Sequence, residues 1–291
     1  MSAISAADVG KLRGATGAAL MDCKKALTES GGDFDKAVDW LRKRGKQIAE
    51  KKADREIKAG AVFADVDAAG RLGVMLELGC ETDFVARNDD FQKVGKALCA
   101  HIAAKNPADA ATLKAQPYEG ATVEEGVKAI SAKTGENVQL GRFVRYEAGA
   151  NGGVFNYIHF TGTKGVLLEL EGSSPAVIAH EETKALAKEL CLHITFADPV
   201  GLTRESVPAD VVAREREVHA QSDALKGKPE NIIAKIIDGK LEAFFKQRCL
   251  IDQGFVKDEK KPIRELLAET GKKAGGKVDI KRFAFFSVGG K

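Results

Sequence analysis

The stretch LELGCETDFVARNDDFQKVGKALCAHIAAKNP, residues 76–107, contains the pattern from which the fold class can be inferred. Its apolar start predicts a β-strand, and a short break at Thr82-Asp83-Phe84-Val85 separates this strand from a helix. The buried stripe of the helix follows helical spacing and consists of Phe91, Val94, Leu98 and Ile102. A second stretch of the same order, LLELEGSSPAVIAHEETKALAKELCLHITFADP, occupies residues 167–199 and has Ser174-Pro175-Ala176-Val177 at its break.

The two stretches belong to a longer internal repeat. Residues 60–107 align with residues 152–199 without a gap, at a constant offset of 92 positions and with 16 identities in 48 positions. Each copy predicts a strand, a turn that contains glycine, a second strand and a helix. Because a small sheet buries one face under a helix, we expect an α+β chain whose core consists of two related α+β subdomains.

Three short helices are predicted before the repeat, and they form a minimal bundle. Leu20, Cys23 and Leu27 lie on one face of the second helix and are expected to be buried. Asp33 is a good N-cap for the third helix, and Gly45 suits its C-terminal end.

A helical hairpin and a last strand are predicted after the repeat. Residues 208–226 and 230–248 form two antiparallel helices, joined at Gly227-Lys228-Pro229, in the manner of a coiled coil. The final segment VDIKRFAFFSV predicts a strand that needs a sheet to join, and the second subdomain is the nearest. The expected domains are residues 1–55 (three-helix module with a basic linker), 56–141 (first core subdomain), 142–204 with 250–291 (second core subdomain) and 205–249 (hairpin).

Composition excludes several functional classes. With 44% apolar and 30% charged residues, the chain is expected to be soluble, and a net charge of +3 is too small to indicate a nucleic-acid binder. Residues 42–58 hold eight Lys/Arg against three Asp/Glu, which favours a solvated face or linker over a phosphate-binding patch.

Cysteine spacing and apolar runs indicate the compartment. The five cysteines are scattered, odd in number and without a C-x-x-C pair, which argues against disulfides and against zinc. No run approaches the roughly 20 apolar residues of a membrane span. The start, MSAISAADV, has neither the apolar core of a signal peptide nor the bias of a transit peptide. We therefore expect a cytoplasmic protein with no membrane contact.

No motif of an enzyme is present. The sequence has no P-loop, no G-x-G-x-x-G, no G-x-S-x-G and no H-E-x-x-H, so we expect no catalytic residue, no cofactor and no metal site. His101 and His193 hold equivalent helix positions, and we interpret them as residues kept from a common unit rather than as a ligand or nucleophile pair. His159 is either a satisfied sheet histidine or a contact with a partner.

Two positions suggest contact with another protein. Met21 is rotated about 100° from Leu20, at the edge of the buried face, so it is either a core gap-filler or an adaptable contact. At the break of the first copy, either Thr82 or Asp83 caps the helix and Phe84 packs back on it, or Phe84 and its neighbouring acid enter a groove of a partner. The second copy forms the same joint with Ala176, so the joint does not require an aromatic residue.

Four segments, in this order, also match one family: TGAALMDCKKAL (16–27), CETDFVARNDDF (80–91), YIH with GVLLEL (157–170) and GKPENIIAKIIDGKLEAFF (227–245). Through them the chain resembles, from about Val9 to its end, bacterial elongation factor Ts, the family of exchange factors for the translation GTPase elongation factor Tu. The resemblance implies an N-terminal three-helix module similar to ubiquitin-associated domains, a two-part core and a coiled-coil hairpin. It further implies release of GDP from elongation factor Tu as the function.

The resemblance also implies partner-binding residues. The matching positions are Arg13, Leu20, Met21 and Lys24 in the N-terminal module, Thr82, Asp83, Phe84 and Val85 at the first joint, and His159 and Val256 in the second half. In this scheme the N-terminal module touches the GTPase domain near the nucleotide. Asp83 and Phe84 enter between helices on the side of the bound magnesium ion.

Departures and alternatives stay open. The family often has two methionines where this chain has Leu20-Met21, and some members have a further C-terminal helical module that the sequence does not show. A protein-binding adaptor without exchange activity is the alternative function, and RNA binding through residues 42–58 is a third. The chain acts alone, as a homodimer or in a 2:2 complex; the sequence favours none of these.

Overall fold

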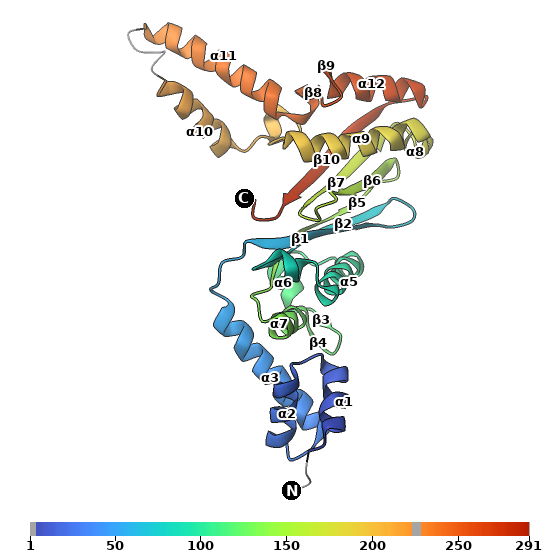
Figure 1. Cartoon of the computed structure of the whole chain (residues 1–291). Helices are drawn as coiled ribbons and strands as arrows, with labels where there is room; N and C mark the ends of the chain where they lie inside the picture. Colours follow the sequence, from blue (N-terminus) through green and yellow to red (C-terminus); the bar gives the residue numbers. More distant parts are fainter. Residues whose placement is uncertain (1–3, 223–227, 291) are drawn as a thin grey trace.

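The computed structural model describes residues 4–222 and 228–290. The molecule is elongated: a three-helix module lies at one end, two stacked sheets with their helices form the middle, and a helical hairpin projects at the other end (Figure 1). This mixture of helices and small antiparallel sheets confirms the predicted α+β class.

The N-terminal module has its own small core. Its helices are α1 (Ala6–Thr16), α2 (Leu20–Glu29) and α3 (Phe34–Lys52). Leu12, Cys23 and Leu27 are buried between them. Asp33 caps α3 as predicted, because its carboxylate accepts a hydrogen bond from the Lys36 amide at 3.0 Å.

The third helix continues past Gly45, so the predicted end at this residue is wrong. A Cβ atom at Gly45 would lie 3.1 Å from the Cβ of Ala132 in α7 (Val123–Thr134). Gly45 is therefore the point where α3 approaches α7 closely, and a residue without a side chain suits it. The segment expected to link the module to the core is helical as far as Lys52 and packs against the core.

The first half of the core is a three-stranded antiparallel sheet in the order β1-β2-β5. Its elements are β1 (Ala59–Val66), β2 (Leu72–Cys80), α4 (Asp83–Ala86), α5 (Asp89–Lys105), α6 (Ala110–Ala115), β3 (Pro117–Tyr118), β4 (Ala121–Thr122), α7 and β5 (Gln139–Glu147). The predicted stripe of α5 faces the sheet: Phe91, Leu98 and Ile102 are fully buried there, and Val94 is partly buried.

The second half is a three-stranded antiparallel sheet in the order β10-β7-β6. Its elements are β6 (Gly152–Ile158), β7 (Lys164–Gly172), α8 (Pro175–Ala179), α9 (Glu181–Ala197), η1 (Arg204–Ser206), η3 (Leu250–Asp252), β8 (Gly254–Phe255), β9 (Asp258–Pro262), α12 (Ile263–Lys273) and β10 (Val278–Ser287). The last strand joins this sheet, as predicted. The bounds of β7 and α9 equal those of β2 and α5 plus 92 positions.

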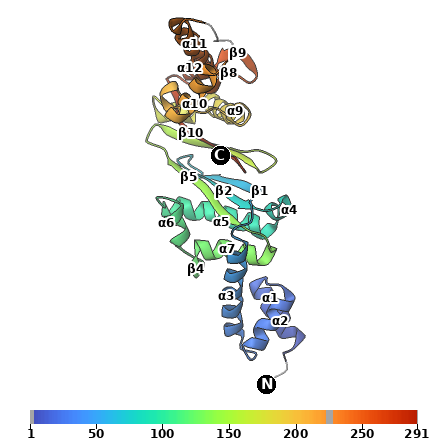
Figure 2. The ribbon, with the colours of Figure 1, turned by 90° about the vertical axis from the view of Figure 1, so that its left-hand side faces the viewer.

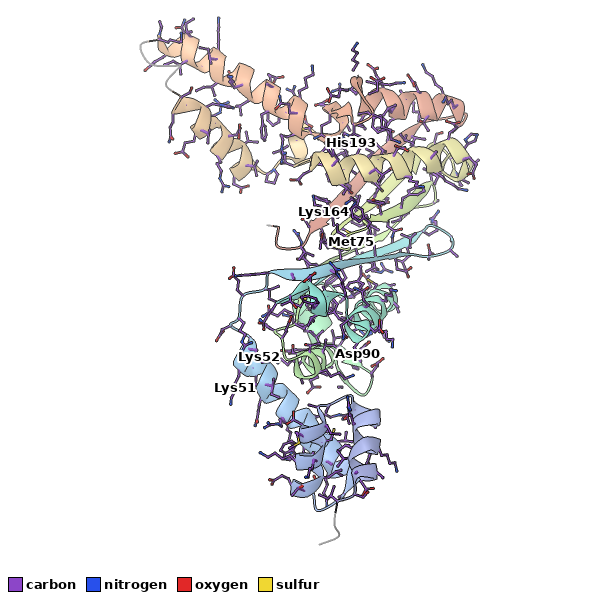
Figure 3. The ribbon with its side chains drawn as sticks, viewed as in Figure 1. Lys51, Lys52, Met75, Asp90, Lys164 and His193 are labelled. Carbon is purple, nitrogen blue, oxygen red and sulfur yellow. The ribbon has the colours of Figure 1, made fainter. Side chains whose placement is uncertain are left out.

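The two sheets stack face to face. Met75 and Leu167 are fully buried between them, and Figure 3 places Met75 at this interface. A Cβ atom at Gly73 would lie 2.5 Å from the side chain of Val154, and one at Gly165 would lie 2.7 Å from that of Val62. Two glycines at equivalent positions thus allow the sheets to approach closely.

An ion pair with an aromatic partner spans the sheets at two equivalent places. In the second sheet, Arg282 Nε donates to Glu169 Oε2 at 2.6 Å, and its guanidinium lies 4.1 Å from the ring centre of Tyr146 in the first sheet. In the first sheet, Arg142 Nε donates to Glu77 Oε2 at 2.9 Å, and its guanidinium lies 4.6 Å from the Phe286 ring of the second. We call Glu169, Arg282 and Tyr146 the second triad, and Glu77, Arg142 and Phe286 the first triad. Each joins one half to the other.

The hairpin consists of α10 (Ala209–Ala220) and α11 (Glu230–Arg248). Ile237 and Leu241 are buried between the helices, with Val212 and Phe245 packed on them. The antiparallel pair confirms the predicted hairpin. Helix α10 ends at Ala220, with Gln221 as its C-terminal cap, so the predicted extent of this helix to residue 226 is wrong. The start of the predicted turn at Gly227 lies outside the described residues.

Candidate functional site

Exposed apolar side chains mark the candidate contact surface. Most large apolar residues of this chain are buried, and burial of such side chains is the default in a folded protein. The exposed exceptions in the described ranges are Leu20, Met21, Phe84, Phe160, Phe196, Val218 and Ile232. Four of the seven lie at the start of α2, on α4 and in the β6–β7 turn, which points to a surface for another protein.

At the start of α2, Leu20 is 52% exposed and Met21 is 71% exposed. The prediction that Leu20 is buried is wrong. Cys23, Ala26 and Leu27 complete the core face of α2, and Leu20 is the first residue of the helix, outside this cluster. Met21 fills no gap in the core, so that alternative is wrong as well, and its role as a contact stays a prediction.

On α4, Phe84 is 83% exposed and does not pack back on the helix. The helix is nevertheless anchored: Thr82 Oγ1 accepts from the Val85 amide at 3.4 Å, and Ala86 is buried in the first core. The Asp83 carboxylate pairs with Arg87 at 3.1 Å on the surface. Phe84 is thus presented to solvent by a short helix that is fixed on its other side.

In the β6–β7 turn, Phe160 is 88% exposed. The turn is closed by two backbone hydrogen bonds, from His159 to the Lys164 carbonyl at 2.9 Å and from Gly162 to the His159 carbonyl at 2.8 Å. His159 Nδ1 lies 3.2 Å from the Tyr157 hydroxyl, and its ring centre is 4.3 Å from that of Phe160. His159 has an internal partner but is not fully buried, so both interpretations of it remain.

Strand β1 connects α4 with the β6–β7 turn. Its Ala59 pairs with Cys80, immediately before the joint, and α4 packs on this strand. Three residues later, the Val62 amide donates to the Gly162 carbonyl of the turn at 2.8 Å. At about 3.3 Å per residue, these two points of β1 are roughly 10 Å apart. Figure 2 shows α2 and α4 on the same side of the elongated molecule.

The remaining predicted site residues differ in their exposure. Arg13 is exposed on α1, and Lys24 is exposed on α2. Val256, in the β8–β9 turn, is half-buried: its amide donates to His193 Nδ1 at 3.2 Å, and its side chain packs on the second core. The structure therefore does not group Val256 with the exposed apolar residues.

Sequence reasoning missed Phe160 and Phe196. Position 160 corresponds to Ala68 in the first copy, and position 196 corresponds to Ala104. The same comparison had singled out Phe84, whose counterpart is Ala176. A large aromatic residue in one copy and alanine in the other is thus the signal that applied to all three exposed phenylalanines.

His101 and His193, at equivalent positions of the two halves, each have an internal hydrogen-bond partner. His101 Nε2 and His193 Nε2 each lie 2.9 Å from a glutamine side-chain oxygen, of Gln116 and Gln253 respectively. Burial lowers the pKa of His193, which favours its neutral form. In the described ranges, no three His, Cys, Asp or Glu side chains gather as a metal site would require, and no helix is long and apolar enough to cross a membrane.

Burial raises the pKa of the Cys80, Cys99 and Cys191 thiols from 9.0 to about 12. The folded state therefore keeps these thiols neutral, and the part of its stability that they contribute is lost as pH rises above about 9 toward 12. We expect the midpoint temperature of unfolding to decrease as pH is raised from 9 to 11, and this decrease to be smaller in Cys191→Ala than in the original chain. Thermal unfolding followed by circular dichroism measures both midpoints. An equal decrease with pH in the two proteins would contradict this expectation.

Together, the fold and the exposed apolar residues are those of an α+β protein with a candidate surface for another protein. The profile of the family described as Elongation factor TS matches residues 81–290. The protein named Elongation factor Ts in Symbiobacterium thermophilum is 45% identical over 293 residues, which cover 99% of this chain and 93% of the relative.

Two further relatives have the same name. The protein of Trichlorobacter lovleyi is 43% identical over 290 residues, which cover 99% of this chain and 93% of the relative. The protein of Aquifex aeolicus is 38% identical over 296 residues, which cover 99% of this chain and 99% of the relative. The chain belongs to the elongation factor Ts family, whose members are translation elongation factors.

Proposed function

We propose that this chain binds elongation factor Tu in its GDP form and promotes release of GDP, so that GTP can bind. The observation on which this rests is Phe84, 83% exposed on an anchored helix. An exposed aromatic side chain loses apolar contact with water when it enters a partner, and such residues often dominate binding energy. The equivalent joint of the second half has Ala176 instead.

The proposed mechanism requires no catalytic residue in this chain. Magnesium and backbone amides hold the phosphates of a bound nucleotide in a GTPase. A factor that binds the nucleotide-free GTPase more tightly than the loaded one must, by linkage, weaken the nucleotide by the same factor. We propose that Asp83 and Phe84 act as a wedge that disturbs the magnesium and phosphate side of the nucleotide site.

The proposed contact residues extend along one side of the molecule. We place Arg13, Leu20, Met21 and Lys24 against the GTPase domain, together with Thr82, Asp83, Phe84 and Val85, and we add Phe160 beside His159. Val256 belongs to this proposal only through the family resemblance, because its side chain is half-buried. A second domain of elongation factor Tu, the cytoplasm as the place of action, and a homodimer or 2:2 assembly are parts of the same proposal.

We also propose that both core halves are copies of one unit, and that the N-terminal module is related to ubiquitin-associated domains. Arg142 and Arg282 hold equivalent places in β5 and β10 but are 140 positions apart. The hairpin, 205–249, then interrupts the second copy. Because β5 pairs with β2, the boundary expected between residues 141 and 142 falls inside this strand, and we propose Gly149 as the boundary instead.

A competition experiment tests the proposed function. Binding to elongation factor Tu is measured by titration calorimetry without nucleotide and at rising GDP concentrations. We expect the apparent affinity of the chain for elongation factor Tu to fall as the GDP concentration rises. It should level off only where GDP and the chain are bound to elongation factor Tu together. An affinity that is the same with and without saturating GDP would contradict exchange and would favour the adaptor without exchange activity.

A further inference from the structure

The joint that precedes Phe84 is held by one carboxylate from another part of the chain. Glu136 follows α7, and its Oε2 accepts from the Glu81 amide at 3.1 Å and from the Thr82 amide at 2.9 Å. Its Oε1 accepts from Thr82 Oγ1 at 2.6 Å. A hydrogen bond to a carboxylate is stronger than a hydrogen bond between two neutral groups, and Glu136 accepts three of them. They fix the backbone at the point where β2 turns into α4.

The second half has no such carboxylate. Gly276 holds the position equivalent to Glu136. The equivalent joint is held by two neutral hydrogen bonds: the Lys277 amide donates to Ser173 Oγ at 3.1 Å, and the Ser173 amide donates to the Lys277 carbonyl at 3.0 Å. Ser174 forms no side-chain cap on α8. The glutamate is thus found only at the joint that presents an exposed aromatic residue, so closing the fold at this place does not require it.

The loop that contains Glu136 is also tied to the end of α3. Lys52 Nζ donates to the Gly135 carbonyl, and Asn137 Nδ2 donates to the carbonyls of Ala53 at 3.2 Å and Arg55 at 2.8 Å. Figure 3 places Lys52 on the part of α3 that reaches the core. The Asn137 amide in turn donates to Glu81 Oε1 at 2.6 Å. Residues 135–137 therefore contact both the N-terminal module's last helix and the joint.

We propose that Glu136 is a positioning residue: it fixes the orientation in which α4 presents Asp83 and Phe84. Its neighbours Gly135 and Asn137 join the same loop to the end of α3. The role rests on the proposed exchange function. Without Glu136, α4 samples several orientations, and only the fraction with the correct one binds the GTPase productively. The apparent affinity then falls by this fraction, whereas the rate at saturation does not.

The first test needs only the free chain. Hydrogen–deuterium exchange of the Glu81 and Thr82 amides is followed in the original chain, in Glu136→Ala and in Glu136→Gln. We expect about tenfold faster exchange in Glu136→Ala, because two charge-assisted bonds are lost, and an intermediate value in Glu136→Gln, which keeps one acceptor. Ser173→Ala, at the joint of the second half, is the matched control and leaves these amides unchanged. Unaltered exchange in Glu136→Ala would overturn the proposal.

The second test separates positioning from a merely structural role. GDP release from elongation factor Tu is measured as a function of factor concentration. We expect Glu136→Ala to raise the half-saturating concentration about tenfold at an unchanged maximal rate. Combined with Asp83→Ala/Phe84→Ala, it should have no further effect, because neither side chain of the wedge is left to orient. An equal effect in both backgrounds would contradict positioning. If the original chain does not accelerate release at all, the proposed function fails, and the amide exchange still decides the role of Glu136.

Discussion

The double variant Asp83→Ala/Phe84→Ala is expected to accelerate GDP release from elongation factor Tu about a hundredfold less than the original chain. Truncation of a central aromatic contact typically costs more than about 2 kcal/mol of binding free energy, and each 1.4 kcal/mol is about a factor of ten. Because the wedge is proposed to act on the loaded GTPase, we expect the loss in the maximal rate and not only in affinity.

The fold should not change in this variant. Phe84 is 83% exposed and the Asp83–Arg87 pair is on the surface, where such pairs contribute little to stability. The anchoring contacts of α4, Thr82 and Ala86, are retained. Stopped-flow release of a fluorescent GDP, together with thermal unfolding, checks both expectations.

The second half provides the control for this prediction. Pro175→Ala together with Ala176→Gly changes the equivalent joint, which has no exposed aromatic residue. We expect release to stay within about twofold of the original chain. Equal losses in both variants, or none in the Asp83/Phe84 variant with an intact fold, would show that this joint is not the wedge.

The replacement Arg282→Met is expected to destabilise the fold by about 3 kcal/mol, the largest effect on stability that we predict. Glu169 is 1% exposed, and Arg282 supplies its ion pair, while Oε1 of Glu169 finds no hydrogen-bond partner among the described residues. Removing one partner of a buried pair leaves an uncompensated charge, which costs roughly 3–5 kcal/mol. Denaturant unfolding measures this cost.

Two variants test the cause of this destabilisation. Arg142→Met breaks the first triad, whose Glu77 side chain is 15% exposed, so water can solvate the carboxylate and the loss should be smaller. Adding Glu169→Leu to Arg282→Met removes the unpaired charge and should restore most of the stability. If Arg142→Met is as costly as Arg282→Met, or if the second change restores nothing, burial of the Glu169 charge is not the cause.

Elements with a strong local pattern were predictable from the sequence. The α5 stripe, the Asp33 cap, the hairpin and the joining of the last strand follow from apolar spacing and from the need of a strand for a sheet. The internal repeat also directed attention to Phe84, because a residue that differs between two copies of one joint is not explained by the joint itself.

The errors arose where tertiary contacts decide. Gly45 has the composition of a helix end, but its lack of a side chain serves the approach of α3 to Ala132. Leu20 follows the helical pattern of Cys23 and Leu27, yet it begins the helix outside their buried cluster and is 52% exposed. Neither fact is local in the sequence.

Glu136 could not be assigned a role from the sequence for the same reason. It lies 54 positions after Thr82 and contacts it only because β5 and β2 are neighbours in the sheet. Phe160 differs: it was missed, although comparison with Ala68 of the first copy would have pointed to it. A difference between the two copies can be read from the sequence, whereas a side chain that holds a distant backbone cannot.

Nucleotide exchange by this chain is measured by stopped-flow release of fluorescent GDP from the cognate elongation factor Tu, with and without the chain. We expect acceleration that grows with the concentration of the chain, reaches a plateau and is reversed by excess GDP. No acceleration at any concentration, with the chain folded and the GTPase active, would contradict it.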